Sequence, residues 1–211
     1  MEKLPKFDIP GHVHFVTSNV YRRIPLFVTY DYCKILLENI DHYRQVHKFS
    51  LFGYVIMPDH FHALILSEED VFIRRIMQDI KKYTAKQIRE HLEQNPQSWD
   101  DFGGLVIPKA NLEKACKTPA RRCLQNFRIP IIDEFLVSVP RTKRQKHQFW
   151  QTSFYDFNVY SEAKLHEKLN YIHQNPVSWS LVDDPANYVY SSYLNYCGDG
   201  QEELPIDVDW L

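Results

Sequence analysis

The sequence lacks the features that would assign it to a disulfide-rich, secreted or membrane class of protein. Its four cysteines include no Cys-x-x-Cys pair, so neither a disulfide framework nor a zinc knuckle is indicated, and free thiols in a reducing compartment are expected. No apolar run approaches the roughly 18 residues of a membrane span. The start, Met-Glu-Lys-Leu-Pro-Lys, lacks the apolar core of a signal peptide. A cytoplasmic protein is therefore expected.

The sequence also lacks a large net charge, but its charges are unevenly distributed. The formal net charge is −2, yet the last thirteen residues hold five acidic and no basic side chains. Residues 1–198 consequently carry 25 basic against 22 acidic side chains. Seven basic residues lie between Arg121 and Lys146, against two acidic ones. Local basic patches, rather than the overall charge, would have to bind any phosphate groups.

Length and composition indicate one globular domain over residues 1–211. The chain has 44% hydrophobic and 25% charged residues, which is ordinary for a globular protein that buries a core. Proline and glycine recur and the hydrophobic pattern loosens at about 94–146, which predicts an insertion with one helix near 112–127. An acidic tail follows at about 199–211.

Hydrophobic periodicity predicts an α+β fold, in which helices pack against an antiparallel sheet of about four or five strands. The expected strands are 12–18, 51–57, 60–66 and a segment from 149, and the expected helices are 31–48, 67–92 and one from 161. A Ser-x-x-Asp pattern predicts that the second helix starts at Ser67, and its periodicity predicts that it buries Phe72. Ser161 caps the third helix, which should end before Pro176 because proline disfavours helical geometry at the preceding residue.

Two histidines in one predicted strand are the first candidate site. His60 and His62 follow the turn at Pro58-Asp59, and alternation along a strand directs both imidazoles to one face. Two imidazoles on a rigid strand make half of a divalent-metal site that leaves positions open for a substrate. The alternative is that both are structural residues that hydrogen-bond locally.

The second candidate site lies in the helix from Ser161. Tyr171 and Asn175 are four residues apart, so they lie on the same flank of the helix and can reach one small object together. Lys164 and Lys168 share this flank, and His173 lies on the opposite one. The alternative is that Tyr171 sits at the edge of the core and that Asn175 only terminates the helix.

Both stretches resemble motifs of one family. The hairpin Gly-Tyr-Val-Ile-Met-Pro-Asp-His-Phe-His-Ala-Leu-Ile resembles the motif of single-tyrosine transposases in the HUH endonuclease superfamily, named for His-hydrophobic-His. Tyr-Ile-His-Gln-Asn-Pro-Val, followed by Tyr190-Ser-Ser-Tyr, is similar to the C-terminal signature of the REP-associated tyrosine transposases. The segment Arg-Arg-Ile-Pro-Leu-Phe from Arg22 also matches in kind and order. The resemblance covers about 10–92 and 147–197.

The resemblance implies a fold and a reaction. The fold is the HUH, ferredoxin-like nuclease architecture, with His60 and His62 central in the sheet. Tyr171 is implied as the nucleophile, and His60, His62 and Asn175 as ligands of Mg²⁺ or Mn²⁺, although some relatives carry glutamine at the last position. Single-stranded or hairpin DNA at palindromic repeats would be cleaved and rejoined through a 5′-phosphotyrosine link. The family also suggests a homodimer, although some members of this branch act as monomers.

Basic and aromatic side chains are further candidates for DNA contacts. The basic candidates lie before Pro25, on the second helix and in the loop that ends the insertion: Arg22, Arg23, Lys81, Lys82, Arg141, Lys143, Arg144 and Lys146. The aromatic candidates for base stacking are Phe149, Trp150, Phe154 and Tyr155. The alternatives are a solvated helix face, a solvated loop and a hydrophobic core.

Other functions remain to be weighed. His12 and His14 form a second His-x-His pair but lack a downstream partner motif. A histidine-triad hydrolase would need a third alternating histidine where this chain has Leu64. A replication initiator or relaxase shares the chemistry, but the chain shows no second tyrosine beside Tyr171 and no attached helicase. A domesticated protein that binds hairpin DNA without cleaving it is the remaining alternative.

Overall fold

The computed structural model describes residues 8–94, 148–198 and 203–207. The predicted insertion lies outside the described residues from residue 95 onward, together with its expected helix and the basic loop that holds Arg141, Lys143, Arg144 and Lys146. Of the predicted acidic tail, residues 203–207 are described.

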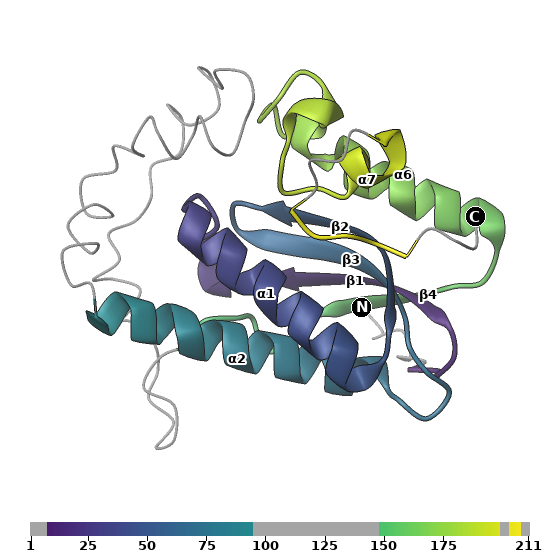
Figure 1. The fold of residues 1–211 in the computed structure, drawn as a ribbon, viewed down its shortest axis with the longest axis horizontal. Coiled ribbons are helices and arrows are strands. Elements are labelled where there is room, and N and C mark those ends of the chain that lie inside the picture. Colours follow the sequence, from purple (N-terminus) through teal and green to yellow (C-terminus); the bar gives the residue numbers. More distant parts are fainter. Residues whose placement is uncertain (1–7, 95–147, 199–202, 208–211) are drawn as a thin grey trace.

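A four-stranded antiparallel sheet forms the centre of the described chain, with strand order β2-β3-β1-β4 (Figure 1). The strands are β1 Val13–Asn19, β2 Ser50–Met57, β3 His60–Leu66 and β4 Tyr155–Val159. The predicted α+β fold is confirmed, and the predicted hairpin is β2 and β3. β3 has a neighbour on each side, so its backbone is held rigidly by two ladders of hydrogen bonds.

Helices cover both faces of this sheet (Figure 1). On one face lie α1 and α2, and on the other lie α6 and the short α7. Their bounds are α1 Tyr30–His47, α2 Ile73–Gln94, α6 Glu162–Ser178 and α7 Tyr193–Cys197, and two single-turn 3₁₀ helices are η1 Tyr21–Arg23 and η3 Pro185–Asn187. No helix in this part of the chain is long and apolar enough to span a bilayer.

The start of α2 differs from the prediction. The helix begins at Ile73, not at Ser67, because the carboxylate of Asp8 accepts hydrogen bonds from the backbone N–H groups of Ile73 at 2.9 Å and Arg74 at 3.4 Å. This cap comes from a residue far away in the sequence, so the local Ser-x-x-Asp pattern was misleading. Phe72, predicted to be buried, lies before the helix and is 40% exposed.

The end of α6 also differs from the prediction. Pro176 lies inside the helix, which continues to Ser178. A proline in the last turn removes only one helical hydrogen bond, and the turn is closed instead by Trp179 N–H donating to the Asn175 carbonyl at 3.0 Å. Asn175 therefore keeps helical geometry, four residues after Tyr171.

The packing of α6 on β2 sets the distance between this helix and the sheet. Gly53 faces α6, and a Cβ atom built on it would lie 2.8 Å from Leu169 Cδ1. Leu165, Leu169 and Ile172 are buried and form the apolar stripe of α6. On the far flank His173 Nε2 lies 3.1 Å from Ser192 Oγ, as predicted for its side of the helix. Gly53 thus permits α6 to lie close over the sheet.

Candidate functional site

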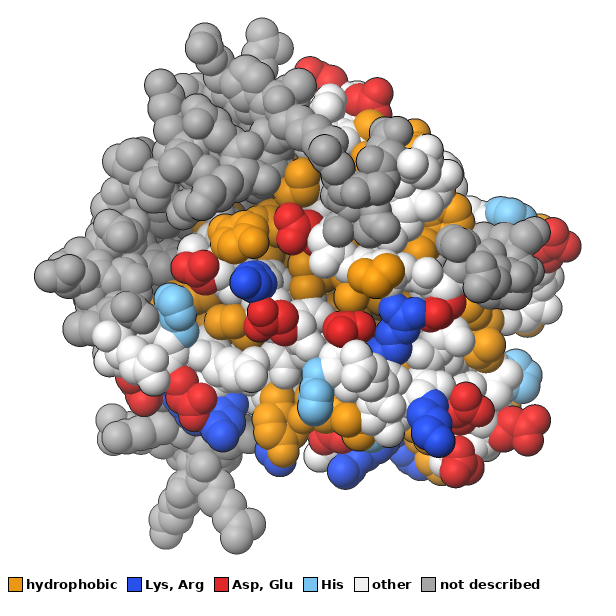
Figure 2. Space-filling model, viewed as in Figure 1, with side chains coloured by type: hydrophobic (Ala, Val, Ile, Leu, Met, Phe, Trp, Pro, Cys, Tyr) orange, Lys and Arg blue, Asp and Glu red, His pale blue; other side chains and the backbone are white. Residues whose placement is uncertain are grey.

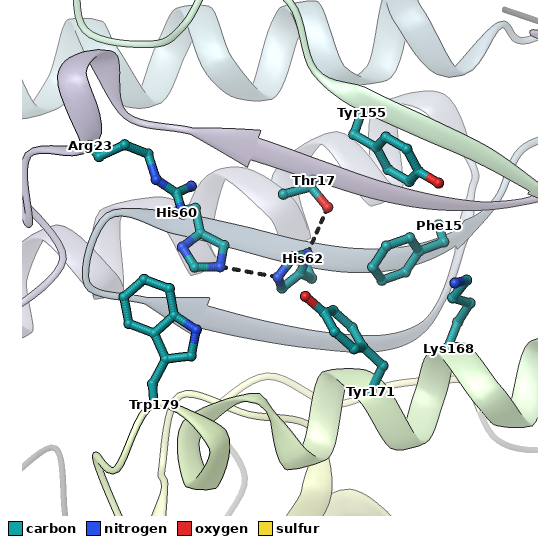
Figure 3. Close-up of a pocket in the computed structure, with 9 residues that line it drawn as sticks. All are labelled: Phe15, Thr17, Arg23, His60, His62, Tyr155, Lys168, Tyr171 and Trp179. Carbon is teal, nitrogen blue, oxygen red and sulfur yellow. Dashed lines mark hydrogen bonds between the residues drawn. The ribbon is translucent and has the colours of Figure 1, made fainter. Parts of the chain in front are cut away.

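A cavity of about 380 Å³ opens between the sheet and α6, and the two histidines of β3 lie in it (Figure 3). His62 pairs with Thr17 across β1 and β3, so both side chains project to the same face of the sheet. Nine residues line the cavity: Phe15, Thr17, Arg23, His60, His62, Tyr155, Lys168, Tyr171 and Trp179. The cavity therefore unites β1, β3, β4 and α6 around His60 and His62.

Neighbouring side chains orient both imidazole rings. The Nδ1–H of His60 donates to Asp59 Oδ1 at 2.5 Å, and Thr17 Oγ1 lies 2.7 Å from His62 Nδ1. Each Nδ1 thus has a partner, and the two Nε2 atoms face each other at 3.1 Å (Figure 3). This arrangement resembles the way in which metal-binding histidines are held by hydrogen bonds to the nitrogen that does not bind.

The electrostatics keep His62 uncharged. Burial, the neighbouring His60 and the Arg23 guanidinium together hold the pKa of His62 well below its usual value of 6.5. A neutral imidazole offers a lone pair at one nitrogen. The carboxylate of Asp59 accepts a hydrogen bond from His60 Nδ1–H, so the lone pair of the His60 ring lies at Nε2.

Asn175 completes this group from α6. Its side chain is buried, and Nδ2 lies 3.2 Å from His62 Nε2. Its Oδ1 is buried and has no hydrogen-bond partner among the described residues. Two facing imidazole nitrogens and a buried amide without a partner for its oxygen fit a bound cation. The described residues contain no cluster of three or more His, Cys, Asp or Glu that could hold a metal, so the amide would have to supply the third ligand.

Tyr171 stands over the histidines and is half exposed to solvent at 50%. Its ring meets the edge of His62, with ring centres 5.3 Å apart, and packs on Phe15 at 5.8 Å (Figure 3). Tyr171 and Asn175 reach the same site from successive turns of α6, as their spacing predicted. The phenol is thus both anchored by its ring and open to a substrate.

Among the basic DNA-binding candidates that the structure describes, Arg23 lines the cavity. Its Nε lies 3.0 Å from Asp59 Oδ2, so it is paired with the carboxylate that orients His60. Its guanidinium also donates to Asn19 Oδ1. Arg22 and Arg23 both have positive φ, 56° and 59°, a strained geometry that the surrounding structure must hold.

The predicted basic residues of α2 are not brought to the cavity. Lys81 Nζ donates to the backbone carbonyls of Gln151 at 2.9 Å and Ser153 at 3.4 Å. Lys82 Nζ lies 4.9 Å from the centre of the Tyr83 ring. Figure 2 shows basic and acidic side chains side by side on the face that α1 and α2 form. A DNA-binding role for Lys81 and Lys82 stays a prediction.

Several cavity residues were not predicted as site residues from sequence. Phe15, Thr17 and Trp179 were not singled out, and Lys168 was placed on the flank of Tyr171 without a role. Thr17 becomes visible only once strand pairing sets it opposite His62. Of the aromatic candidates for stacking, Tyr155 lines the cavity, whereas Trp150 is 6% exposed and belongs to the core.

The rival histidine pair does not form a site. His14 is fully buried on the other face of the sheet, and both ring nitrogens are engaged, with Asp156 Oδ1 at 2.9 Å and the Ile9 carbonyl at 3.0 Å. His12 lies before β1 and contacts the Pro10 carbonyl. The idea of a metal site at His12 and His14 is therefore wrong.

Comparison with known proteins supports the resemblance found in the sequence. Residues 10–102 match the family model described as IS200-like transposase. A solved structure of a REP-associated tyrosine transposase bound to a REP hairpin shares the fold, with a TM-score of 0.61 and 17% identity over 100% of this chain and 92% of that chain. A Deinococcus radiodurans R1 protein provisionally assigned as a transposase matches at 14% identity and a TM-score of 0.41, over 81% of this chain and 95% of that one. No curated protein matches the sequence.

Proposed function

We propose that this chain is a metal-dependent DNA strand transesterase, on the support of the match of residues 10–102 to the IS200-like transposase model and the fold shared with a REP-associated tyrosine transposase. It cleaves single-stranded DNA beside a hairpin and rejoins it through a 5′-phosphotyrosine on Tyr171. The observation that carries the proposal is the meeting of Tyr171 with the facing Nε2 atoms of His60 and His62 in one cavity. The related structure holds a REP hairpin, which supports hairpin DNA as the substrate class.

His60, His62 and Asn175 would hold Mg²⁺ or Mn²⁺. When bound, such an ion would draw charge from the non-ester oxygens of the phosphodiester and from the departing 3′ oxygen. Asp59 and Thr17 keep the two imidazoles oriented through Nδ1. The residues therefore supply both a metal site and the contacts that keep it ready before a metal arrives.

Tyr171 performs the covalent step. Its phenolic oxygen attacks phosphorus while the bond from phosphorus to the 3′ oxygen breaks; the phenol loses its proton and the 3′ oxygen gains one. The phosphodiester is exchanged and not hydrolysed, so the energy of the bond is kept for rejoining. A phenol of pKa ~10 is a better leaving group than an alcohol, which favours the reverse attack by a 3′-OH.

The second candidate function is a protein that binds hairpin DNA without cleaving it. The observation that favours it is the ion pair of Arg23 with Asp59. This ion pair engages the Arg23 guanidinium, which would otherwise be available to a phosphate in the cavity. This candidate predicts hairpin binding that is insensitive to EDTA and to substitution of Tyr171.

The adduct test separates these two functions. Purified protein with Mn²⁺ or Mg²⁺ is incubated with a pool of single-stranded and hairpin DNAs, denatured, and tested for DNA that stays attached. We expect an adduct with the wild-type chain that EDTA prevents, and none with Tyr171→Phe, which keeps the ring but lacks the nucleophile. Sequencing the attached strands would then reveal the target.

Tyr193→Phe serves as the matched control, since this tyrosine lies in α7 and does not line the cavity. It should form the adduct at the wild-type level. An adduct that persists in Tyr171→Phe would overturn the assignment of the nucleophile. Hairpin binding without any adduct, unchanged by EDTA, would favour the non-catalytic function.

A further inference from the structure

The aromatic rings of the cavity form a continuous row. Successive ring centres are 5.4 Å apart from Trp179 to His60, 4.7 Å from His60 to His62, 5.4 Å from His62 to Phe15 and 6.2 Å from Phe15 to Tyr155. The histidines occupy the middle of the row, and Trp179 and Tyr155 lie at its opposite ends (Figure 3). Tyr171 faces the middle. The two end rings therefore flank the place where the proposed reaction occurs.

Exposure distinguishes these end rings from the core aromatics. Tyr155 is 53% exposed and is one of the few large hydrophobic side chains that are exposed in the described residues. Trp179 is half-buried. Both line the cavity, whereas Trp150 is almost fully buried. Aromatic side chains that line a cavity and keep solvent exposure are suited to stack on a flat ligand, and single-stranded DNA offers flat faces in its unstacked bases.

A cation accompanies the Tyr155 end of the row. Lys168 lines the cavity one turn before Tyr171, with its ammonium 5.4 Å from the centre of the Phe15 ring and 5.0 Å from that of Phe157. Its partner is the carboxylate of Glu167 at 3.2 Å, which is half exposed at 49%. A phosphate can replace such an exposed carboxylate at little cost, because surface ion pairs are weak.

We propose that single-stranded DNA crosses this cavity with one nucleobase on each side of the bond that Tyr171 attacks. One base stacks on Trp179 and the other on Tyr155, while Lys168 binds the phosphate on the Tyr155 side. Trp179 and Lys168 thereby gain a substrate-binding role that the sequence did not assign, and Tyr155 is selected from the four aromatic candidates for stacking. The inference rests on the proposed function for the identity of the bond, but the binding of the strand can be measured without cleavage.

Paired probes separate stacking from phosphate contact. In the Tyr171→Phe background, binding is measured for a short oligothymidylate and for an abasic strand of equal length, which keeps the phosphates but lacks the bases. Tyr155→Ala and Trp179→Ala should each weaken oligothymidylate binding about 5-fold to 150-fold, the range of one lost stacked base, and leave the abasic strand unchanged. Lys168→Gln should weaken both strands and reduce the slope of log affinity against log salt by about one unit.

Control variants exclude unspecific losses. Tyr160 is 71% exposed and outside the cavity, and Lys34 lies on α1, so Tyr160→Ala and Lys34→Gln should bind both strands like the background protein. Trp179→Phe should recover most of the loss in Trp179→Ala, because stacking needs only an aromatic face. Trp179 also packs on the core, and Tyr155→Ala gives an independent test at an exposed position.

The outcomes distinguish this inference from the proposed function. Three outcomes would overturn the proposed path of single-stranded DNA between Trp179 and Tyr155. They are an equal loss of affinity for both strands in the aromatic variants, no loss of affinity at all, and no binding of oligothymidylate by the background protein. Selective loss on oligothymidylate supports the path even if the adduct test fails, in which case the cavity binds DNA without cleaving it. An adduct on Tyr171 without a selective loss of oligothymidylate affinity would support the proposed function and contradict the proposed DNA path.

Discussion

At the scale of single residues, the pair of Asp59 and His60 decides how the candidate metal site is prepared. Asp59 is 4% exposed and contacts His60 on one side and Arg23 on the other. The sequence predicted His60 as a candidate ligand, from its strand position and the family resemblance, and Asp59 only as a turn residue. The structure adds that the same carboxylate directs the ring and holds Arg23 in the cavity.

Removing this carboxylate should weaken metal binding. We expect Asp59→Ala to lower Mn²⁺ affinity by about 10-fold to 100-fold, since the loss of a group that orients a ligand costs this much in other metal sites. Asp59→Asn keeps an oxygen that accepts from His60 Nδ1, so its affinity should stay within a few-fold of wild type. Titration with Mn²⁺, monitored by the electron paramagnetic resonance signal of the free ion, measures the affinity of both variants.

His60→Ala provides the reference for complete loss of a ligand, and it should weaken Mn²⁺ binding as well as adduct formation. Asp59→Ala with wild-type affinity would mean that His60 needs no orientation, and the role given to the carboxylate would have to be withdrawn.

At the scale of elements, the contact of α6 with β2 determines where Tyr171 and Asn175 lie. The stripe of α6 packs on the sheet at Gly53, where an added Cβ atom would lie 2.8 Å from Leu169 Cδ1. Tyr171 and Asn175 occupy the adjoining flank, so a shift of the helix axis moves both away from His62. The role of Gly53 was not anticipated, because nothing in a strand pattern reveals which helix will lie across it.

Enlarging Gly53 should displace α6. We expect Gly53→Val to lower the free energy of unfolding by about 1–3 kcal/mol, the usual cost of an overpacked core, and to reduce adduct formation. Urea denaturation measures the first effect and gel analysis of the adduct the second. Combined with Leu169→Ala, which removes the clashing atom, the loss should be smaller than the sum of the two single losses. Additive losses would show that the clash is not the cause.

At the scale of the whole molecule, C-terminal segments cover the outer edge of β2. Ile56 N–H donates to the Tyr190 carbonyl at 2.9 Å, and Asp207 N–H donates to the Leu51 carbonyl at 2.9 Å. The carboxylate of Asp207 accepts from Leu51 N–H at 2.8 Å and pairs with Arg44. An edge strand with unpaired backbone groups would be prone to association, so this part of the predicted tail protects the fold.

Loss of the Asp207 side chain should therefore destabilise the sheet edge. We expect Asp207→Ala to lower the free energy of unfolding by about 1–2 kcal/mol, because it leaves Leu51 N–H without its acceptor. Thermal unfolding measures the change, with Glu203→Ala as the control, an exposed acidic residue of the same tail. Equal stability of the two variants would argue that the tail only lies on the surface. Homodimer formation stays a prediction at this scale.

The sequence by itself determined the features that depend on local periodicity. Alternation set His60 and His62 on one face of a strand, and the helical repeat set Tyr171 and Asn175 on one flank, because side-chain direction follows from φ and ψ over a few residues. The order of strands and helices followed from the same patterns.

Only the tertiary structure decided which distant groups meet. Asp8 replaced Ser67 as the cap of α2, Thr17 came to orient His62, and Trp179 and Tyr155 came to flank the cavity. Lys81, a basic candidate for DNA contacts in the sequence, donates hydrogen bonds to backbone carbonyls in the structure. Such partners are chosen by the packing of the sheet against α6 and α2, whose contacts join residues far apart in the chain and leave no local pattern in the sequence.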